Sequence, residues 1–348
     1  MKHQKVTIKF IAEKAGVSFS TVAKALHDDP VINIQTRERI KSLAKQYNYR
    51  PNILAKGLRS RRTKTIGVIL NDLQSPFYSE IYKAIGDVLN NKGYTMFLAD
   101  SNYDVALEKK NISTMISQGV EGIIISSVNE ESENIELLLE ESIKTVFIDN
   151  RPVRTDVCCV YVDHESAATL AMEYLIKSGH RDILLLNGPE HLPSSQHYLQ
   201  GFTEALAAHA IPFRKDFVKH NPIDINETAT QMDKILTGQD PVGPKDFTAI
   251  VTLSDVIAMG VYESAFAHGF TVPGTYSVVG YDNIFASKYL APPLTTINQP
   301  KEQTGLIAVN MVLDCIESDE SERVQVILNP ELVIRSSVRS LQKAHFVC

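Results

Sequence analysis

The chain has 348 residues, of which 44% are hydrophobic and 22% charged, a balance typical of a globular protein with two or three domains. No apolar run approaches the roughly 18 residues of a membrane span, and no secretory signal is apparent, so we expect a cytoplasmic protein without a membrane partner. Residues 1–65 contain 15 Lys/Arg and 4 Asp/Glu, which leaves 20 basic and 37 acidic residues in the remainder. A small basic N-terminal region (the head) followed by a larger acidic region (the body) is typical of a nucleic-acid-binding domain attached to a second domain.

The basic head predicts three short helices. Residues 7–14 and 19–26 are separated by "AGVS", in which Gly16 suits a tight turn and Ser18 suits a helix N-cap. A third helix follows Asn33, another N-cap residue, over 34–49. Each segment carries apolar residues at helical spacing, so the three can close a core. Two short helices joined by a glycine-containing turn indicate a helix-turn-helix.

A helix-turn-helix places its second helix in the major groove of DNA. Phe19, Ser20 and Lys24 would project outward there and can contact base edges. Short hydroxyls before and within the helices can bind phosphate oxygens, and we assign this role to Thr7, Ser18 and Thr21. Thr7 and Ser18 also suit pure helix capping, and both roles can coexist because a helix N-terminus binds phosphate.

The segment "RPNILAKGLRS" separates the head from the body. Its apolar spacing is helical, but it is short and Gly57 weakens it by about 0.5–1 kcal/mol relative to alanine. An isolated helix of this length is marginal in water.

The body alternates apolar strands with helices, which predicts parallel sheets and an α/β fold. About 275 residues is large for one such sheet, so two lobes are expected. Strands are predicted at 65–70, 94–99, 122–127, 145–150, 159–163, 182–188, 249–253 and 277–281. Helices are predicted at 77–92, 165–179, 199–210 and 256–269.

Enzyme and metal motifs are absent from the sequence. There is no GxGxxG, GxxxxGK[ST], GxSxG, HExxH or EF-hand loop, so we expect neither an enzyme nor a cofactor nor a metal site. Four cysteines, at 158, 159, 315 and 348, form no CxxC pair and are interpreted as reduced thiols. A secreted sugar-binding protein would share the body, but it would lack the basic head.

The motifs together resemble the lactose-repressor (LacI/GalR) family of bacterial transcription regulators. The resemblance begins with "TIKFIAEKAGVSFSTVAKAL" and "YRPNILAKGL" and continues through "SDVIAMGVYESAFAHGFTVPGTYSVVGYDN", "PPLTTINQP" and "NPELVIRSS". It implies a homodimer on double-stranded operator DNA, with a hinge helix that forms on the operator. The implied hinge contacts to DNA are Asn52, Ala55 and Leu58, with Leu58 as a minor-groove wedge.

The resemblance also implies the domain plan. The helix-turn-helix head would occupy 1–50, the hinge 51–64, a two-lobed periplasmic-binding-protein-like body 65–339, and a tail 340–348. The N-lobe would hold about 65–161 and 293–322, and the C-lobe about 163–291 and 323–339. The chain would cross between lobes near Val162, Pro292 and Arg323.

A ligand should sit in the cleft between the lobes, at the carboxyl ends of the strands. By resemblance, the effector contacts are Phe77, Tyr78, Ser126, Asp149, Ser254, Asp282 and Gln299, to which we add Tyr198. Tyr198 stands where the family pattern "RxxGF" usually has an arginine, so a strongly anionic ligand is disfavoured unless Arg151 or His197 compensates. Asp255 and His180 are interpreted as structural.

Two further departures concern the head. Phe10 stands where the family usually has an aspartate, so the first helix would fray or Phe10 would pack on another side chain. Ala23 and Lys24 replace a frequent Ser-Arg pair, so the operator cannot be copied from a relative.

We therefore expect a sequence-specific regulator, most simply a repressor, controlled by a sugar or related neutral metabolite. The alternatives left open are a corepressor-type member that responds to a nucleobase or a phosphoprotein, and, in another class, a sugar-binding protein without DNA function.

Overall fold

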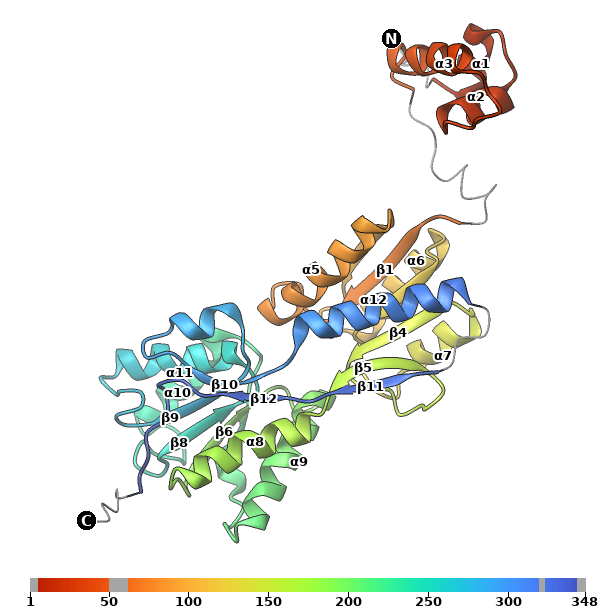
Figure 1. Cartoon of the computed structure of the whole chain (residues 1–348). Helices are drawn as coiled ribbons and strands as arrows, with labels where there is room; N and C mark the ends of the chain where they lie inside the picture. The colour runs from red at the N-terminus through yellow and green to blue at the C-terminus, as the bar shows by residue number, and fades with distance from the viewer. Residues whose placement is uncertain (1–5, 50–61, 319–322, 343–348) are drawn as a thin grey trace, which may run out of the picture. The chain divides into compact units, whose positions relative to one another are not determined.

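The computed structural model describes residues 6–49, 62–318 and 323–342, and the chain divides into two compact units, Met1–Thr63 and Lys64–Cys348 (Figure 1). The predicted hinge helix, with Asn52, Ala55 and Leu58, lies outside the described residues.

The first unit is the expected three-helix head. Its helices are α1 (Ile8–Ala15), α2 (Phe19–Leu26) and α3 (Ile34–Gln46). Side-chain oxygens of Thr7, Ser18 and Asn33 accept hydrogen bonds from backbone N–H groups in the first turns of these helices, as the N-cap pattern predicts. Gly16 ends α1 at φ 62°, a conformation that glycine adopts without strain. The helices close a small core around Ile11, Val22, Ala25 and Ile40, which are fully buried.

The N-lobe of the second unit is a six-stranded parallel sheet covered by helices on both faces. Its strand order is β11 (Gln325–Leu328), β5 (Cys158–Val162), β4 (Lys144–Asp149), β3 (Gly122–Ile125), β1 (Thr65–Leu70) and β2 (Thr95–Asp100). In β1, Ile66 and Val68 face α5 (Pro76–Asn91) and α12 (Lys301–Glu317), whereas Ile69 faces α6 (Val105–Ser117) and α7 (Glu133–Glu140). Figure 1 shows α5 and α12 side by side on one face of this sheet.

The C-lobe has a second six-stranded sheet around a single large core. Its order is β12 (Glu331–Val333), β10 (Thr295–Asn298), β9 (Ser277–Asp282), β8 (Ala249–Thr252), β6 (Ile183–Asn187) and β7 (Val218–His220), with only β12 antiparallel to its neighbour. Its helices are α8 (His164–Lys177), α9 (Pro193–Ala208), α10 (Ile225–Leu236), α11 (Asp255–Ala267) and the 3-10 turns η1 (Lys215–Phe217) and η2 (Phe285–Tyr289).

The crossings between the lobes correct two of the expected positions. The chain leaves the N-lobe after β5, at the predicted Val162. The crossing expected near Pro292 is wrong, because β10 pairs with β9 in the C-lobe sheet and the chain returns only after Asn298. The crossing expected near Arg323 is wrong as well, because β11 pairs with β5 in the N-lobe, so the last crossing lies between Leu328 and Glu331. The short strands β10, β11 and β12 have a mixed composition that did not indicate a strand in the sequence. The lobe to which each belongs is set by the strand with which it pairs.

None of the helices described here is both long and apolar enough to cross a membrane. Cys158, Cys159 and Cys315 are buried reduced thiols, as expected for three of the four cysteines, and Cys158 Sγ lies 3.9 Å from Cys315 Sγ.

Candidate functional site

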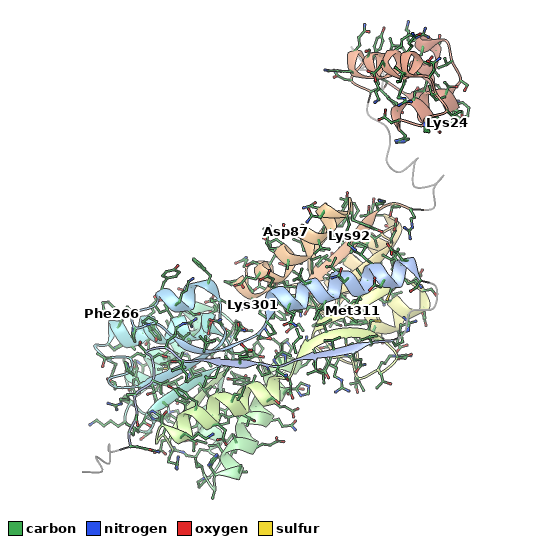
Figure 2. All side chains as sticks on the ribbon, in the orientation of Figure 1. Lys24, Asp87, Lys92, Phe266, Lys301 and Met311 are labelled. Atoms are coloured by element: carbon green, nitrogen blue, oxygen red, sulfur yellow. The ribbon has the colours of Figure 1, made fainter. Side chains whose placement is uncertain are left out.

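The exposed face of α2 carries the residues assigned to DNA. Phe19 is 56% exposed and Lys24 points into solvent (Figure 2), while Ser20 is half-buried. Ser18 Oγ accepts from the backbone N–H of Thr21 at 3.1 Å and lies 2.9 Å from Thr21 Oγ1. These hydroxyls therefore cap the helix, and both remain at the surface next to the backbone N–H groups that make a helix N-terminus a phosphate site.

Phe10 packs on another side chain, one of the two outcomes expected for it. Its ring meets Tyr47 edge to face with centroids 5.1 Å apart, and Lys14 Nζ lies 5.6 Å from the ring centre. Helix α1 still begins at Ile8, because Thr7 Oγ1 accepts from the N–H of Phe10. An aromatic contact with α3 thus takes the place of an acidic first turn.

A cleft opens between the lobes at the carboxyl ends of the strands, and its cavity volume in this structure is about 60 Å³. Six of the eight predicted effector residues line it: Phe77, Tyr78, Asp149, Ser254, Asp282 and Gln299.

The N-lobe wall is a connected polar network. Tyr78 Oη donates to Asp149 Oδ2 at 2.6 Å, and Ser126 Oγ donates to the same oxygen at 3.2 Å. Asn71 Nδ2 donates to Ser126 Oγ at 3.0 Å. Burial, with the nearby Asp149 charge, raises the pKa of Tyr78 well above its ordinary value, so the phenol stays protonated and donates. Ser126 therefore supports the wall from behind and does not itself line the cleft.

Asp282 dominates the C-lobe wall. Gln299 Nε2 donates to its Oδ1 at 2.7 Å, and the residue is only 7% exposed. Burial and the charge of Asp255 raise the pKa of Asp282 well above its ordinary value. Ser254 sits beside it as the N-cap of α11, where Ser254 Oγ accepts from Ile257 N at 3.1 Å.

Asp255 is structural, as the sequence indicated. Its carboxylate is fully buried and accepts hydrogen bonds from the N–H of Ile284 at 2.9 Å, from Thr296 Oγ1 at 2.6 Å and from Ser287 Oγ. Burial nevertheless raises its pKa to about 6. The residue therefore fixes the turn that follows β9 and does not line the cleft.

Tyr198 does not line the cleft in this structure. It is fully buried in the C-lobe core, with its ring centroid 5.3 Å from that of Tyr281, and Tyr281 forms the wall in front of it. The position that the family pattern assigns to a cleft arginine is therefore occupied by a second layer of aromatic packing.

Several wall residues were missed in the sequence: Asn71, Asp72, Ser75, Tyr103, Asn150, His164, Leu192, Ser194, Ile223, Leu253 and Tyr281. Asn71, which directly follows β1, and Tyr281, near the end of β9, could have been found by the strand-end rule. His164 is the most informative. Its Nδ1 lies 2.7 Å from Tyr281 Oη, whereas its buried Nε2 has no partner among the described residues. Burial lowers the pKa of His164, which favours the neutral ring.

Arg151 and His197, which could have compensated for the missing arginine, line an adjoining pocket that shares Asp149 and His164 with the cleft. His197 Nδ1 lies 2.8 Å from Glu165 and Nε2 lies 3.2 Å from Glu130, and Arg151 lies 5.6 Å from the ring centre of Tyr161. No lysine or arginine is found among the described residues that line the cleft, but Asp72, Asp149 and Asp282 are. His180 is structural, as predicted, with contacts to Thr248 Oγ1 and the carbonyl of Arg339.

A three-helix head joined to a two-lobed α/β body with a ligand cleft defines a DNA-binding regulator with an effector domain. Residues 7–52 match the family of bacterial regulatory proteins, lacI family, and residues 63–335 match periplasmic binding proteins and sugar binding domain of LacI family. The chain belongs to the LacI family. Its members are transcriptional regulators and not enzymes.

Individual relatives extend over nearly the whole chain. The HTH-type transcriptional repressor PurR of Pasteurella multocida (strain Pm70) is 30% identical over 335 residues, which are 96% of this chain and 99% of the relative. The lac repressor dimer bound to operator and the anti-inducer ONPF has a TM-score of 0.83 at 26% identity, covering 97% of this chain and all of that one. The complex of the transcriptional regulator CelR with cellobiose has a TM-score of 0.70 at 25% identity, covering 95% and 99%.

Proposed function

We propose that this chain is a repressor that binds a near-palindromic operator as a homodimer, and that an uncharged sugar in the cleft controls its DNA affinity. The choice of an uncharged sugar rests on the chemistry of the residues that line the cleft. Carboxylates, phenols and amides face the cleft, with no lysine or arginine among the described lining residues. Such groups hydrogen-bond to hydroxyls, whereas a phosphate or carboxylate ligand would meet like charge and no cation.

Aromatic side chains complete a sugar-type site. Phe77 and Tyr78 meet edge to face with centroids 5.0 Å apart at the start of α5, and Tyr103 and Tyr281 also line the cleft. Their flat apolar faces can cover the C–H face of a sugar ring while neighbouring acceptors bind its hydroxyls.

A nucleobase is the second candidate, and the curated relatives favour it. The repressor from P. multocida is named PurR, and the flat aromatic faces near Phe77 could equally cover a base. A sugar hydroxyl and a base N–H can both donate to Asp282, so this residue does not discriminate between the two ligand classes.

Exposed apolar side chains support the homodimer. Edge strand β2 exposes Phe97 and Leu98 by 40% and 38%, and the C-lobe exposes Phe266, Phe285 and Tyr289 by 87%, 66% and 67% (Figure 2 labels Phe266). An unpaired strand edge and large exposed aromatic rings are liabilities in a monomer, and a second copy of the chain would cover them.

The DNA half of the proposal is tested by selecting binding sites from random duplexes with the full-length protein. A dimer with two reading helices should return inverted repeats. Six to ten phosphate contacts should cost roughly 10³–10⁵ in affinity between 50 and 200 mM salt. Recovery of binding sites without an inverted repeat would refute binding as a dimer with two recognition helices.

The effector half is tested by a thermal-shift screen of sugars, nucleosides, nucleobases and sugar phosphates, since a true ligand raises apparent stability by mass action. Hits are then titrated against Asp282→Ala. Loss of this hydrogen-bond partner should weaken the hit by roughly 2- to 10-fold and leave operator binding intact, because Asp282 belongs to the body. A sugar phosphate as the strongest hit would contradict the assignment.

A further inference from the structure

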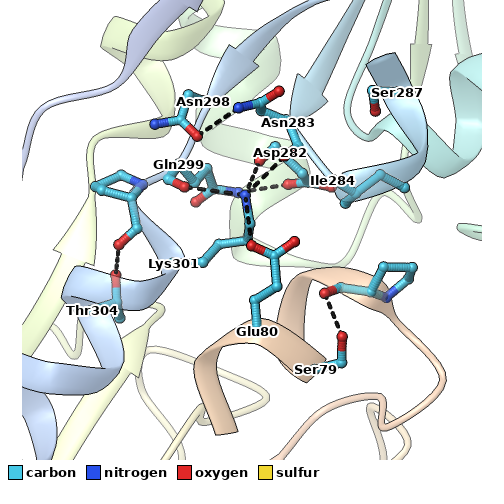
Figure 3. A network of polar contacts seen from close by, with 12 residues as sticks. Ser79, Glu80, Asp282, Asn283, Ile284, Ser287, Asn298, Gln299, Lys301 and Thr304 are labelled. Atoms are coloured by element: carbon cyan, nitrogen blue, oxygen red, sulfur yellow. Dashed lines mark hydrogen bonds and ion pairs between the residues drawn. The ribbon is translucent and has the colours of Figure 1, made fainter. Parts of the chain in front are cut away.

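Lys301 is the first residue of α12 and belongs to the N-lobe, yet its side chain ends in the C-lobe. Its Nζ donates to the carbonyl of Asp282, to that of Asn283 at 3.2 Å and to that of Gln299 at 3.4 Å (Figure 3). The carboxylate of Glu80, on α5 of the N-lobe, lies 3.8 Å from the same nitrogen. The lysine is 4% exposed, so it spans the two lobes at the point where the chain crosses between them.

The position of this lysine runs against two general preferences. A cation at a helix N-terminus opposes the helix dipole, which favours acidic residues there. A buried ammonium must also replace its water with protein acceptors. Helix α12 therefore gains nothing from Lys301 as its first residue. The carbonyl oxygens at the end of β9 make the position of the Lys301 side chain favourable, because they replace the water molecules that would otherwise hydrate its ammonium group.

The receiving turn has an unusual backbone. Asp282 has φ 106° and Asn283 has φ 53°, both in the region that side chains with a Cβ rarely adopt. The C-lobe holds Asn283 by its side chain, since Asn283 Nδ2 donates to Asn298 Oδ1 at 3.0 Å and Arg335 donates to Asn283 Oδ1 at 2.6 Å. Residues held in this region persist only where their surroundings fix them.

The same turn carries the acidic group of the cleft. Gln299 Nε2 donates to Oδ1 of Asp282, so this oxygen is already hydrogen-bonded. The direction of Oδ2 depends on the backbone conformation of Asp282, whose carbonyl accepts from Lys301. On the N-lobe side, Glu80 lies one turn after Phe77 on α5, a wall helix. Lys301 thus connects the C-lobe wall to the N-lobe elements that form the opposite wall.

We propose that Lys301 is a positioning residue for effector binding. It fastens the turn at Asp282 and Asn283 to α12 and α5, and so it couples the direction of the Asp282 carboxyl to the angle between the lobes. The inference rests on the proposed function only in treating Asp282 as an effector contact. It assigns Lys301 a role in the geometry of the cleft and none in contacting the ligand, since the lysine does not line it.

The decisive variant is Lys301→Met, which keeps the length of the side chain and removes its donors and charge. Lys301→Arg restores both and is the conservative rescue. Val309→Ala is the matched control, because it removes a fully buried side chain of the same helix without touching the carbonyls. Glu80→Gln tests the ion pair separately, and it should have little effect because Glu80 is 42% exposed and 3.8 Å away.

The first measurement is the distance between the lobes in the full-length protein without DNA or effector. Spin labels are placed at Lys83→Cys on α5 and Lys177→Cys on α8, both exposed, with Cys348 changed to serine. Labelled chains are diluted into unlabelled protein, so that a dimer carries one labelled copy. The wild type, Lys301→Arg and Val309→Ala should share one distance distribution. Lys301→Met should reduce the population of that arrangement relative to others by about tenfold or more, since hydrogen bonds to a charged group are among the stronger ones.

The second measurement is a crystal structure of Lys301→Met, in which φ of Asp282 should leave the region near 106°. The inference is overturned if Lys301→Met keeps the wild-type distance distribution, if Val309→Ala changes it equally, or if φ of Asp282 is unchanged in the variant. None of these readouts uses operator or ligand, so they remain interpretable even if the selection or the effector screen contradicts the proposed function.

Discussion

Asp255 offers a direct test of how the acidic groups behind the cleft affect stability. Burial raises its pKa to about 6, from an ordinary value of 3.8. For an acid whose pKa is raised on folding, the unfolded chain ionises first, so stability is highest below pH 4 and is lost as the pH rises through about 6. At about 1.36 kcal/mol for each pH unit of the difference, ionised Asp255 costs the folded state about 3 kcal/mol at neutral pH.

The perturbation is Asp255→Asn, which keeps the shape of the side chain. The amide oxygen can accept from Ile284 and Ser287, and the hydroxyl of Thr296 can rotate to accept from the new NH₂ group. The variant should therefore gain about 1–3 kcal/mol at pH 7, where the wild type carries the cost of ionisation.

The assay is urea unfolding of both proteins at pH 4.5 and pH 7. Carboxyl groups that do not interact with Asp255 titrate alike in both proteins and cancel in the comparison. Asp282 does not cancel, because the Asp255 charge raises its pKa, and its response enlarges the advantage of the variant at pH 7. The stability advantage of Asp255→Asn should be about 2 kcal/mol larger at pH 7 than at pH 4.5, since most of the ionisation cost appears in that window. Asp314→Asn, at an exposed position of α12, is the control and should change neither value. An advantage for Asp255→Asn that is the same at both pH values would refute the reasoning.

Further outcomes are expected elsewhere in the chain. A Cβ at Gly201 would lie 2.2 Å from a backbone carbonyl of α8, so Gly201→Ala should cost about 1–3 kcal/mol in urea unfolding, whereas Gly86→Ala, with its nearest contact at 3.5 Å, should gain about 0.5–1 kcal/mol. Hydrogen bonding to Glu130 raises the pKa of His197 to about 9, so this contact should stabilise the body below about pH 6.5 and be lost as the pH rises through 9, a change that His197→Gln should abolish in thermal scans. Gly57→Ala should tighten operator binding roughly 5- to 30-fold in gel-shift titrations, if the hinge folds only on DNA.

Strands with a continuous apolar run could be predicted from the sequence, and those with a mixed composition could not. The segment 65–70 agrees with β1 residue for residue, because every position in it is buried and apolar or small. Strands β7, β10, β11 and β12 have three or four residues each and were missed. Their strand character comes from pairing with a partner far away in the chain, which no local window contains.

Some of the cleft residues could also be predicted from the sequence, and others could not. Wall residues at strand ends, such as Asp149 and Asp282, could be placed from the sequence because parallel strands end at one edge. Tyr198 could not, since a helix residue reaches the cleft only if no other side chain stands in front of it, and here Tyr281 does. Lys301 had a local signal that was not used: a lysine directly after the Gln-Pro pair that precedes α12 is misplaced for the helix dipole and therefore needs a partner.

Acidic groups line the cleft, whereas two cations make contacts between the lobes. The acidic residues Asp149 and Asp282 line the cleft. Two cations connect the lobes. Lys301 donates to carbonyls of the C-lobe, and His197 contacts Glu130 of the N-lobe. We expect that substituting one of these cations shifts the relative populations of the lobe arrangements, and the apparent affinity of a ligand that binds one arrangement should change by the same factor.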